Sequence, residues 1–291
     1  MGAVVGAVVR GMRVRQWVKN LLVVAAPVAA GQLLEPEVLV PTLLALVGFC
    51  LLSSSVYLVN DCADAEADRQ HPVKKARPVA AGELTVPVAL TVAALLAAVA
   101  LGLGALASLE LVLVMVGYLV LQVLYAVWLK HEPVLDLAVV TLGFLLRTVA
   151  GGLAAEIPIS QWFLLVAGFG SLFVVAGKRY SELHTLGSEA GTRRSLVRYT
   201  DTYLRFVWSI AAGATVMSYS LWAFENGAGA DIPWHMISIA PFVVAMLRYA
   251  VDIDAGTAAE PEEIVWRDRM LQGIGVLWLV VFLLGVAGAG T

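Results

Sequence analysis

Residues 39–78 of the chain, LVPTLLALVGFCLLSSSVYLVNDCADAEADRQHPVKKARP, contain both the strongest fold signal and the strongest functional signal. Residues 39–59 are mostly apolar, and about 20 apolar residues are enough for a helix to cross the hydrocarbon core of a bilayer. Residues 60–78 contain three aspartates, a glutamate, an asparagine and a cluster of bases. Such charges are costly beside hydrocarbon, so their position directly after a predicted span requires an explanation.

The composition extends this pattern to the whole chain. Of its 291 residues, 60% are hydrophobic and only 14% are charged, whereas a soluble domain is about half apolar and a quarter charged. Nine segments are long and apolar enough to cross a membrane as helices. The sequence therefore predicts an all-α, polytopic membrane protein that forms a single domain over residues 1–291. The nine predicted spans are residues 18–34, 38–59, 86–107, 110–129, 134–154, 160–177, 206–224, 234–250 and 270–289.

The distribution of Lys and Arg predicts the orientation in the membrane. If nine spans alternate in direction, all the basic segments fall on one side. The connections on the other side, GQLLEPE, LGALASLE, AEIPIS and ENGAGADIP, contain neither Lys nor Arg. By the positive-inside rule, the N-terminus and the basic loops are cytoplasmic, with the chain in the inner or plasma membrane. Residues 1–17 are expected to form a basic interfacial helix, and residues 60–85 and 178–205 to form cytoplasmic active-site loops.

The aspartates that follow the second span share one face of a helix. If this span continues as a helix past Asn60, each residue turns by about 100°. Three carboxylates then fall on one stripe: Asp61, Asp64 and Asp68. Tyr57 shares this face, Asn60 lies at its margin, and Glu66 points nearly the opposite way. Like charges at these spacings repel one another, and a bound cation would reverse the sign of that interaction.

The residue types in this stretch predict a magnesium-dependent diphosphate site. Oxygen ligands without His or Cys suit a hard cation, Mg²⁺ before Ca²⁺ or Mn²⁺. Mg²⁺ commonly shares its coordination between carboxylates and phosphate oxygens, and Arg and Lys bind phosphate. The following loop supplies such bases: Arg69, Lys74, Lys75 and Arg77. The alternative, a solvated helix end followed by topological charges, explains the bases but not the one-sided aspartates.

Three other polar groups lie in or beside predicted spans. GKRYSELH, residues 177–184, brings four candidates to the same membrane face, although KR after an apolar run is also a topology signal: Lys178, Arg179, Tyr180 and Glu182. Arg248 and Asp252 are spaced i, i+4 and can equally form a local salt bridge. Arg147 lies about 20 Å along its span, where a guanidinium needs a polar cavity or a partner. The neighbouring glycines are expected to allow close helix packing: Gly143, Gly151 and Gly152.

The stretch NDCADAEAD, residues 60–68, has the form N-D-x-x-D-x-x-x-D. It resembles the first signature of the UbiA-type intramembrane prenyltransferase superfamily. Further segments resemble the same family in the same order along the chain: RVRQWVKNLLVVAAP, HPVKKARPVAAG, GFLLRTVAGGLAAEIPISQWF and GKRYSEL. The resemblance covers essentially the whole chain. It implies nine transmembrane helices around a cytoplasm-facing polar cavity that contains the active site.

The chain departs from the superfamily pattern after the sixth predicted span. Members that use an isoprenoid diphosphate usually carry a second aspartate-rich motif there, whereas this sequence has KRYSELH, with one acid and two bases. In GKRYSELH, YTDTYLRFVW and LRYAVDIDAG it is similar to the branch of decaprenyl-phosphate phosphoribosyltransferases. That resemblance implies transfer of 5-phosphoribosyl from 5-phosphoribosyl 1-diphosphate to a polyprenyl phosphate. The product would serve the synthesis of the arabinose donor of mycobacterial-type (arabinogalactan) cell walls.

The resemblance also implies roles for the candidate residues. Mg²⁺ on the donor's diphosphate would be held by Asn60 and the three aspartates, which are the predicted catalytic residues. Lys74 and Arg77 would bind the leaving diphosphate. The 5-phosphate or the lipid phosphate would be bound by residues of other segments: Lys178, Arg179, Tyr180, Lys19 and Arg147. Tyr57, Glu182 and Arg248 complete the predicted substrate-binding set.

Two other functions stay open at this point. An ordinary prenyltransferase of the same superfamily would join an isoprenoid diphosphate to an aromatic or sugar acceptor. A transporter would use the acidic motif as an ion site, but carriers place such charges near the membrane midplane on broken helices. Here all the charged candidate residues except Arg147 and Asp136 are predicted at the cytoplasmic rim of the membrane. No nucleic-acid partner is predicted, and the sequence leaves a homo-oligomer open.

Overall fold

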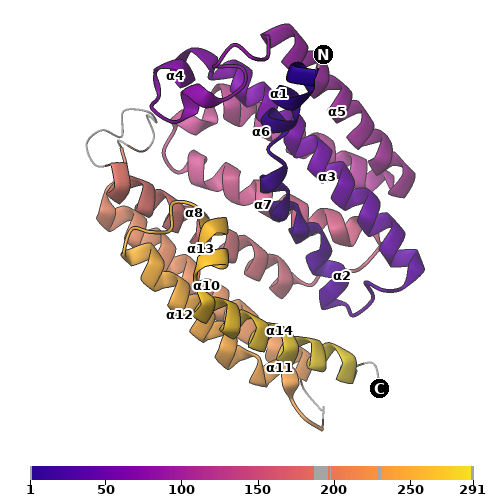
Figure 1. Ribbon diagram of the computed structural model, residues 1–291. Coiled ribbons are helices and arrows are strands. Elements are labelled where there is room, and N and C mark those ends of the chain that lie inside the picture. The colour runs from indigo at the N-terminus through magenta and orange to yellow at the C-terminus, as the bar shows by residue number, and fades with distance from the viewer. Residues whose placement is uncertain (1, 187–195, 197, 228–230, 290–291) are drawn as a thin grey trace. The chain divides into compact units, whose positions relative to one another are not determined.

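The computed structural model (Figure 1) describes residues 2–186, 196, 198–227 and 231–289. All regular elements within these residues are helices, which confirms the all-α prediction. The chain divides into two compact units. The first comprises residues 1–28, 32–139 and 146–158, and the second comprises residues 29–31, 140–145 and 159–291. The expectation of a single domain over the whole chain stays a prediction.

The helices begin where the sequence provides start signals. Pro36, Pro87 and Pro261 occupy the first turn of α3, α5 and α13, where a missing N–H costs nothing. The elements up to residue 158 are α1 (Gly2–Met12), η1 (Val14–Val24), α2 (Ala25–Ala29), α3 (Pro36–Ala63), α4 (Ala65–Gln70), η2 (Lys74–Ala76), α5 (Val86–Ala107), α6 (Leu109–Val127), η3 (Leu129–His131) and α7 (Leu135–Ala154). The later ones are α8 (Gln161–Leu186), α10 (Asp201–Gly227), α11 (Trp234–Ile237), α12 (Ile239–Asp254), α13 (Pro261–Arg267) and α14 (Arg269–Ala289).

Eight helices in the described ranges are long and apolar enough to cross a membrane. They coincide with the second to ninth predicted spans, so the chain is a multi-pass membrane protein. Their bounds are Pro36–Ala63, Val86–Ala107, Leu109–Val127, Leu135–Ala154, Gln161–His184, Asp201–Gly227, Trp234–Asp254 and Arg269–Gly288.

The first predicted span, residues 18–34, is not one long helix. The chain forms an eleven-residue 3₁₀ helix, η1, followed by the five-residue helix α2. A 3₁₀ helix rises about 2.0 Å per residue, so η1 alone extends about 22 Å. With α2 the segment reaches roughly 30 Å, which is the thickness of the hydrocarbon core. The segment is thus long enough to cross the bilayer, but the first predicted span, and with it the total of nine, stays a prediction.

The 3₁₀ conformation of η1 has a consequence for its side chains. In such a helix, residues three apart lie one above the other. Trp17, Asn20 and Val23 therefore form a single row, and each contacts other elements of the first unit. The indole N–H of Trp17 donates to the Ser54 hydroxyl at 3.0 Å, Asn20 is buried and Val23 belongs to the hydrophobic core. An α-helix would have spread these three residues over a much wider arc.

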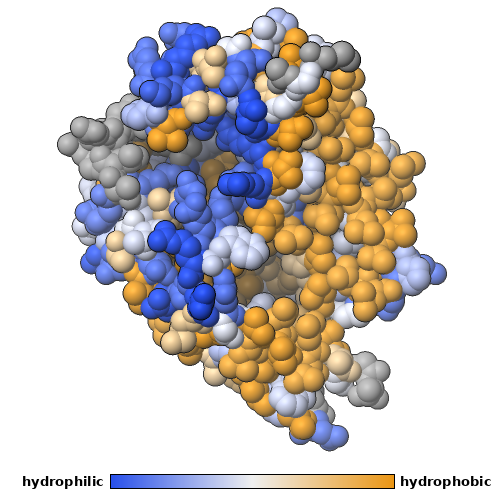
Figure 2. All heavy atoms as spheres, in the orientation of Figure 1, coloured by the Kyte–Doolittle hydropathy of each residue, from blue (hydrophilic) through white to orange (hydrophobic). Residues whose placement is uncertain are grey.

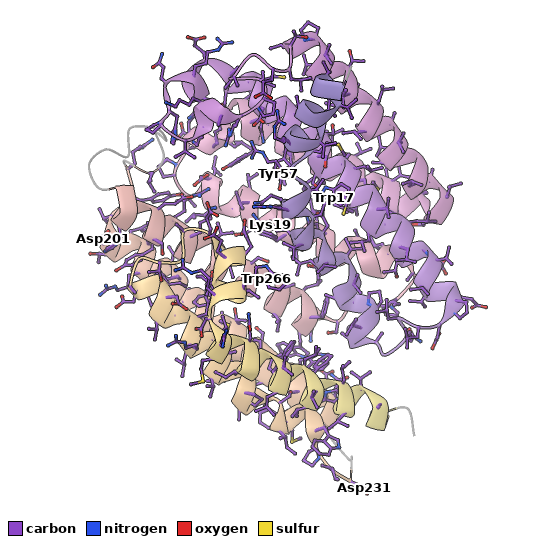
Figure 3. The ribbon with its side chains drawn as sticks, viewed as in Figure 1. Trp17, Lys19, Tyr57, Asp201, Asp231 and Trp266 are labelled. Atoms are coloured by element: carbon purple, nitrogen blue, oxygen red, sulfur yellow. The ribbon has the colours of Figure 1, made fainter. Side chains whose placement is uncertain are left out.

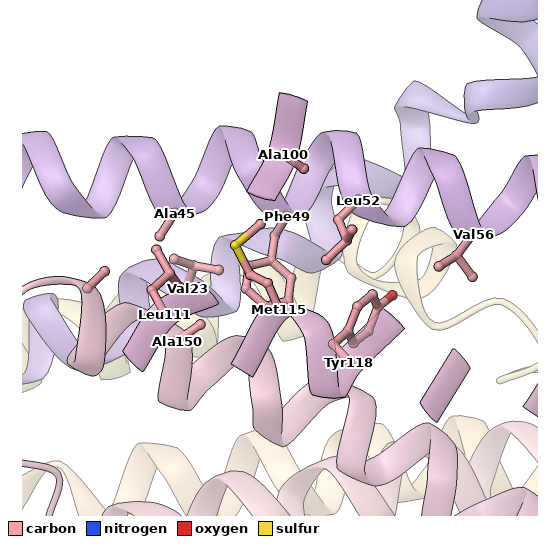
Figure 4. Packing of buried hydrophobic residues seen from close by; sticks show 11 residues of the cluster. Val23, Ala45, Phe49, Leu52, Val56, Ala100, Leu111, Met115, Tyr118 and Ala150 are labelled. Atoms are coloured by element: carbon pink, nitrogen blue, oxygen red, sulfur yellow. The ribbon is translucent and has the colours of Figure 1, made fainter. Parts of the chain in front are cut away.

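The core of the first unit lies where η1, α3, α5, α6 and α7 pack together (Figure 4). Phe49 of α3 meets Tyr118 of α6 edge to face, with ring centroids 5.4 Å apart. η1 and α7 approach closely at Gly151 of α7, where an added Cβ would stand 1.7 Å from the carbonyl oxygen of Val23. The expected packing role is confirmed for this glycine. The contact fixes η1 against α7, which carries Arg147.

The surface of the first unit is divided by polarity. Figure 2 shows a mainly hydrophobic surface over α5 and a hydrophilic one over α4. Large apolar side chains of α5, including Leu95 and Val99, are exposed. A helix that exposes such side chains suits contact with lipid, whereas the charged α4 suits contact with water.

In the second unit, α8 packs against α10 and α12. Phe173 of α8 makes edge-to-face contacts with Trp208 of α10 and Tyr249 of α12. A Cβ at Gly177 of α8 would overlap the side chain of Ile253 of α12, so a glycine allows the close approach there. These contacts hold α8, α10 and α12 together and position the candidate residues of this unit.

Candidate active site

The acidic stretch lies where α3 ends and α4 begins. α3 ends at Ala63, and Asp64 interrupts the helix with φ −96° and ψ 2°. The interruption is confined to this residue, because the amide N–H groups of Asp64 and Asp68 still donate to the carbonyl oxygens of Asn60 and Asp64. The three aspartates therefore keep the helical spacing that the sequence predicted, across a break that the sequence did not predict.

Each aspartate of the stretch is paired with a base from another segment. Arg13, between α1 and η1, contacts the carboxylate of Asp61. Arg77 reaches Asp68 at 2.6 Å and Asp61 at 3.4 Å through the same nitrogen, Nη1. The Asp64 carboxylate forms its ion pair with a lysine that follows α6, Lys130. Asp61 and Asp68 are 2% and 3% exposed, so these two carboxylates are largely removed from water.

The fourth acid of the stretch behaves differently. Glu66 is exposed and pairs with Arg69 at 2.6 Å, one turn further along α4. The exposure confirms the predicted separation of Glu66 from the aspartate stripe. An exposed pair of this kind contributes little to stability, so both residues serve as controls for the buried pairs.

The deep arginine of α7 has partners inside the first unit. The guanidinium of Arg147 is 6% exposed. Its Nε donates to the Asn20 side-chain oxygen and an Nη donates to the Tyr118 hydroxyl, both at 2.7 Å. The Asn20 amide in turn donates to Ser53 at 3.2 Å and to the Cys50 sulfur at 3.4 Å. The predicted need of a buried guanidinium for polar partners is confirmed, and these partners come from η1, α3 and α6.

Three other predicted residues of this unit lie on or near α3, η1 and the loop after α4. Tyr57 lies on α3 and Lys19 on η1 (Figure 3). The guanidinium of Arg13 lies over the Tyr57 ring, 5.0 Å from its centroid. The backbone N–H of Lys74 donates to Nδ1 of His71, which shapes the loop between α4 and Arg77. Burial, and then the charge of Lys74, lower the pKa of His71. This loop is therefore held by a neutral imidazole.

The second unit contains the cluster predicted from GKRYSELH. Arg179 is buried and pairs with Glu182 at 2.8 Å, and Lys178 lies 3.7 Å from the same carboxylate. The buried Tyr180 hydroxyl accepts a hydrogen bond at 2.7 Å from Arg205 of α10. Arg205 also pairs at 2.9 Å with an acid at the end of α12, Asp254. Lys178, Arg179 and Glu182 thus form one charged group. Tyr180 instead contacts a pair that the sequence did not single out, Arg205 and Asp254.

Arg248 forms a different pair from the one considered in the sequence. Its Nε donates to Asp268 at 2.6 Å, across the α13 segment, and not to Asp252 one turn away. The hydrogen bond from Arg248 holds the pKa of the Asp268 carboxyl below its usual range. Asp268 also accepts the backbone N–H groups of Met270 and Leu271 at the start of α14. Arg248 therefore ties α12 to the start of α14.

Four charged residues of these clusters were missed as site residues. In the sequence, Lys130 counted only as a topological base, Arg13 and Arg205 as topological bases within resembling segments, and Asp254 only as part of a resembling segment. The available signal was their position at span ends on the predicted cytoplasmic side. That signal is shared by every base of the inner face, so it does not select these four.

The donor set was tested for its fit to a divalent cation. Within the described part of the chain, no three Asp, Glu, His or Cys side chains stand close enough to hold a metal ion by themselves. Asp61 and Asp68 nevertheless converge on one nitrogen of Arg77, and Asp64 is a third carboxylate on the same stripe. Mg²⁺ typically takes one or two carboxylates and completes its shell with water and substrate phosphates. These residues therefore fit Mg²⁺ bound together with a diphosphate.

Fold and side chains together define a class: a multi-pass, all-helical membrane protein with paired carboxylates and bases at the end of a span. The comparison with known proteins makes this class specific. Residues 21–267 match the UbiA prenyltransferase family, and the chain belongs to that family.

Several relatives match over most of their length. A protein of Mycobacterium tuberculosis named decaprenyl-phosphate phosphoribosyltransferase is 49% identical over 288 residues, which cover 97% of this chain and 95% of the relative. A protein of the same name from Mycolicibacterium smegmatis is 47% identical, over 94% of this chain and 91% of the relative. A UbiA homolog from Archaeoglobus fulgidus, in a structure with GPP and Mg²⁺, has a TM-score of 0.74 at 19% identity, covering 98% and 100% of the two chains. This last similarity shows the fold alone.

Proposed function

We propose that the chain transfers a 5-phosphoribosyl group from 5-phosphoribosyl 1-diphosphate to a polyprenyl phosphate, decaprenyl phosphate in its named relatives, with release of diphosphate. The observation that carries this proposal is the 46–49% identity to decaprenyl-phosphate phosphoribosyltransferases over at least 94% of the chain. The product would be a precursor for the arabinan of the cell wall. Positive-inside topology supports an active site that faces the cytoplasm.

The charges of the two units support a donor with several phosphates. A phosphoribosyl diphosphate carries a 5-phosphate besides its diphosphate, and the acceptor is itself a phosphate. The first unit offers Arg13, Arg77 and Lys130 beside its carboxylates. The second unit offers Lys178 and Arg179, where an ordinary prenyl-diphosphate enzyme would be expected to carry a second group of acids. Arg and Lys are suited to bind phosphate.

The bond changes of the proposed reaction need no general base. An oxygen of the lipid phosphate, already anionic at neutral pH, attacks the anomeric carbon of the ribose as the bond to the diphosphate oxygen breaks. The developing charge resides on the leaving diphosphate. Lys74 and Arg77 would stabilise it through charge-assisted hydrogen bonds. The Tyr180 hydroxyl, held by Arg205, and the neighbouring bases would orient the 5-phosphate or the lipid phosphate.

Asn60 and the carboxylates of Asp61, Asp64 and Asp68 would hold Mg²⁺, a role supported by their oxygen-only chemistry and spacing. The ion would neutralise charge on the diphosphate. Asp61 and Asp68 are buried and both contact Nη1 of Arg77, so the two carboxylates face a common point. Asp64, with its side chain 35% exposed, is the carboxylate nearest to water.

A donor competition tests the reaction. Membranes that contain the protein are incubated with Mg²⁺ and a polyprenyl phosphate, with either labelled phosphoribosyl diphosphate or labelled isoprenoid diphosphate. We expect label in the lipid fraction only from the phosphoribosyl donor. Transfer only from the isoprenoid donor would establish the alternative, an ordinary prenyltransferase of the family that acts on an aromatic or sugar acceptor.

A pair of matched variants tests the site. We expect Asp64→Asn to lose most of the transfer activity while detergent stability stays near normal, because this carboxylate is partly exposed. Glu66→Gln, which alters the exposed acid two residues away, should keep nearly full activity. Near-full turnover of the Asp64→Asn variant would exclude this carboxylate from the site.

A further inference from the structure

The last two turns of α12 carry buried polar oxygens that the proposed active site does not use. Tyr249 is 8% exposed, and within the described part of the chain its hydroxyl has no hydrogen-bond partner. Asp252 lies three residues later and therefore on the same face of the helix. Its Oδ2 atom is buried and has no hydrogen-bond partner among the described residues. Such atoms are rare in native proteins, and each points to an ordered water, an ion or another bound group.

A second acid acts on the same hydroxyl from another helix. Glu262 stands in the first turn of α13, and the charges of Asp252 and Glu262 both act on the Tyr249 hydroxyl. The hydroxyl nevertheless donates to neither carboxylate. An edge-to-face contact with Phe173 of α8, with ring centroids 5.6 Å apart, holds the tyrosine ring in place. Three oxygen-bearing groups therefore converge without the hydrogen bond that a phenol can donate to a carboxylate.

The turn between α12 and α13 is anchored at two points. The N–H and the hydroxyl of Thr257 donate to the carbonyl oxygen of Asp252, at 2.9 and 3.0 Å. The N–H of Ala258 donates to the Ser181 hydroxyl of α8 at 3.0 Å. These bonds fold the chain back after α12. The approach of Glu262 to the end of α12 is therefore fixed by the surrounding structure.

Neither helix supplies Asp252 with a hydrogen-bonded base. Arg248, the one base of α12, donates to Asp268. Arg267, the one base of α13, is exposed at the far end of that helix. Carboxylates that share a site repel each other where water is scarce. A water molecule would satisfy the hydrogen bonds of this cluster but bring no positive charge, whereas a bound cation supplies the charge as well.

We propose that Tyr249, Asp252 and Glu262 bind one divalent cation, which joins the end of α12 to the start of α13. Oxygen ligands without nitrogen or sulfur suit a hard ion such as Mg²⁺, Mn²⁺ or Ca²⁺. Two carboxylates balance its charge, the phenol oxygen is a third ligand, and water completes the shell. Because cation–oxygen distances are about 2.0–2.6 Å, oxygens as much as about 5 Å apart can share one ion.

This site goes beyond the proposed function, because it takes part in no step of phosphoribosyl transfer. Its ligands come from the segment that joins the last two spans. They do not come from the segment after α8, where members of the superfamily that use an isoprenoid diphosphate carry a second acidic motif. The expected consequence of the bound ion is a link between α12 and α13 that stabilises the second unit.

Equilibrium binding of radioactive Mn²⁺ to the purified, detergent-solubilised full chain tests the site. Every sample carries Asp64→Asn, so that the acidic stretch at the end of α3 is weakened as a competing metal site. In this background we expect about one Mn²⁺ per chain to stay bound. Adding Asp252→Asn should weaken this binding about 10-fold or more, because affinity follows the number of charged ligands. Adding Tyr249→Phe, which keeps both carboxylates, should weaken it several-fold.

Glu263→Gln is the matched control, because it removes an exposed acid of the same turn of α13. This variant should bind Mn²⁺ like the Asp64→Asn background. Equal binding by Asp252→Asn and Glu263→Gln would overturn the inference and leave a buried water as the partner of these oxygens. Tyr249→Phe decides the matter if Asp252→Asn fails to fold. Mg²⁺ or Ca²⁺ should displace the bound Mn²⁺, and equal displacement by K⁺ would refute a divalent site.

Thermal unfolding measures the link between the two helices. In the Asp64→Asn background, Mn²⁺ at about 100 times its dissociation constant should raise the midpoint by about 5 °C, and Asp252→Asn should abolish the rise. Binding with an unchanged midpoint would mean that the unfolded chain binds Mn²⁺ equally well, which overturns a site built by the fold. Neither measurement contains a donor or an acceptor, so both outcomes are independent of the proposed reaction.

Discussion

Replacing Gly151 with alanine would test the close approach of η1 and α7 in the first unit. The new Cβ would stand 1.7 Å from the carbonyl oxygen of Val23, whereas ordinary contact begins at 3.4 Å. In a close-packed interior, η1 and α7 would have to separate by about 1.7 Å. The same two elements are joined by the hydrogen bond from Arg147 to Asn20, 2.7 Å long. A separation of that size would break it, because such bonds weaken beyond about 3.2 Å.

Overpacking and the lost hydrogen bond together give the expected decrease in the free energy of unfolding. Overpacking a core costs about 1–3 kcal/mol, and losing a hydrogen bond to a buried charged group costs about 1.5–3 kcal/mol. We therefore expect Gly151→Ala to destabilise the protein by about 3 kcal/mol or more. Activity should fall as well, because η1 carries Lys19 and α7 carries Arg147.

Thermal unfolding in detergent and transfer of labelled phosphoribosyl measure the two consequences. Gly102→Ala is the matched control, because Gly102 also lies in a spanning helix and an added Cβ there meets nothing within 4 Å. We expect this control to keep its midpoint and its turnover. If Gly151→Ala behaved like Gly102→Ala in both measurements, the close approach of η1 and α7 would be wrong.

Two smaller perturbations test other contacts of the first unit. Tyr118→Phe removes the hydroxyl that accepts a hydrogen bond from Arg147 but keeps the ring beneath the guanidinium. We expect the free energy of unfolding to fall by about 1.5–3 kcal/mol. An unchanged thermal midpoint would contradict this expectation. For His71, burial lowers the pKa below 6.5, so its stabilising contribution is fully present above pH 6.5 and is lost as the pH falls through the lowered pKa. Amide exchange at Val73 and Lys74, corrected for its intrinsic pH dependence, should therefore accelerate in that range, because Nδ1 accepts both N–H groups.

The sequence predicted those features that depend on local pattern. Apolar length located eight spans, because a helix that satisfies its own backbone hydrogen bonds needs about 20 mostly apolar residues to cross the bilayer. Helical periodicity placed Asp61, Asp64 and Asp68 on one stripe and Glu66 away from it, since the break at Asp64 keeps the helical hydrogen bonds on either side. The depth of Arg147 in its span correctly predicted buried polar partners.

Features that depend on distant contacts were not predictable in the same way. The 3₁₀ form of η1 has no signal in its composition. It is compatible with a tertiary cause, because it aligns Trp17, Asn20 and Val23 against α3 and α7. The i, i+4 rule suggested Asp252 as the partner of Arg248, but local spacing does not show that Asp268 lies closer once α13 has folded back.

The bases of this chain serve two purposes that a sequence alone does not separate. Arg13 and Lys130 obey the positive-inside rule, and so they needed no further explanation in the sequence. In the structure they pair with Asp61 and Asp64, which are 48 and 66 residues away. Ordering such distant side chains costs conformational entropy, and a topology signal does not require it. Their pairing with distant carboxylates therefore distinguishes these two bases from bases that only lie at the membrane surface.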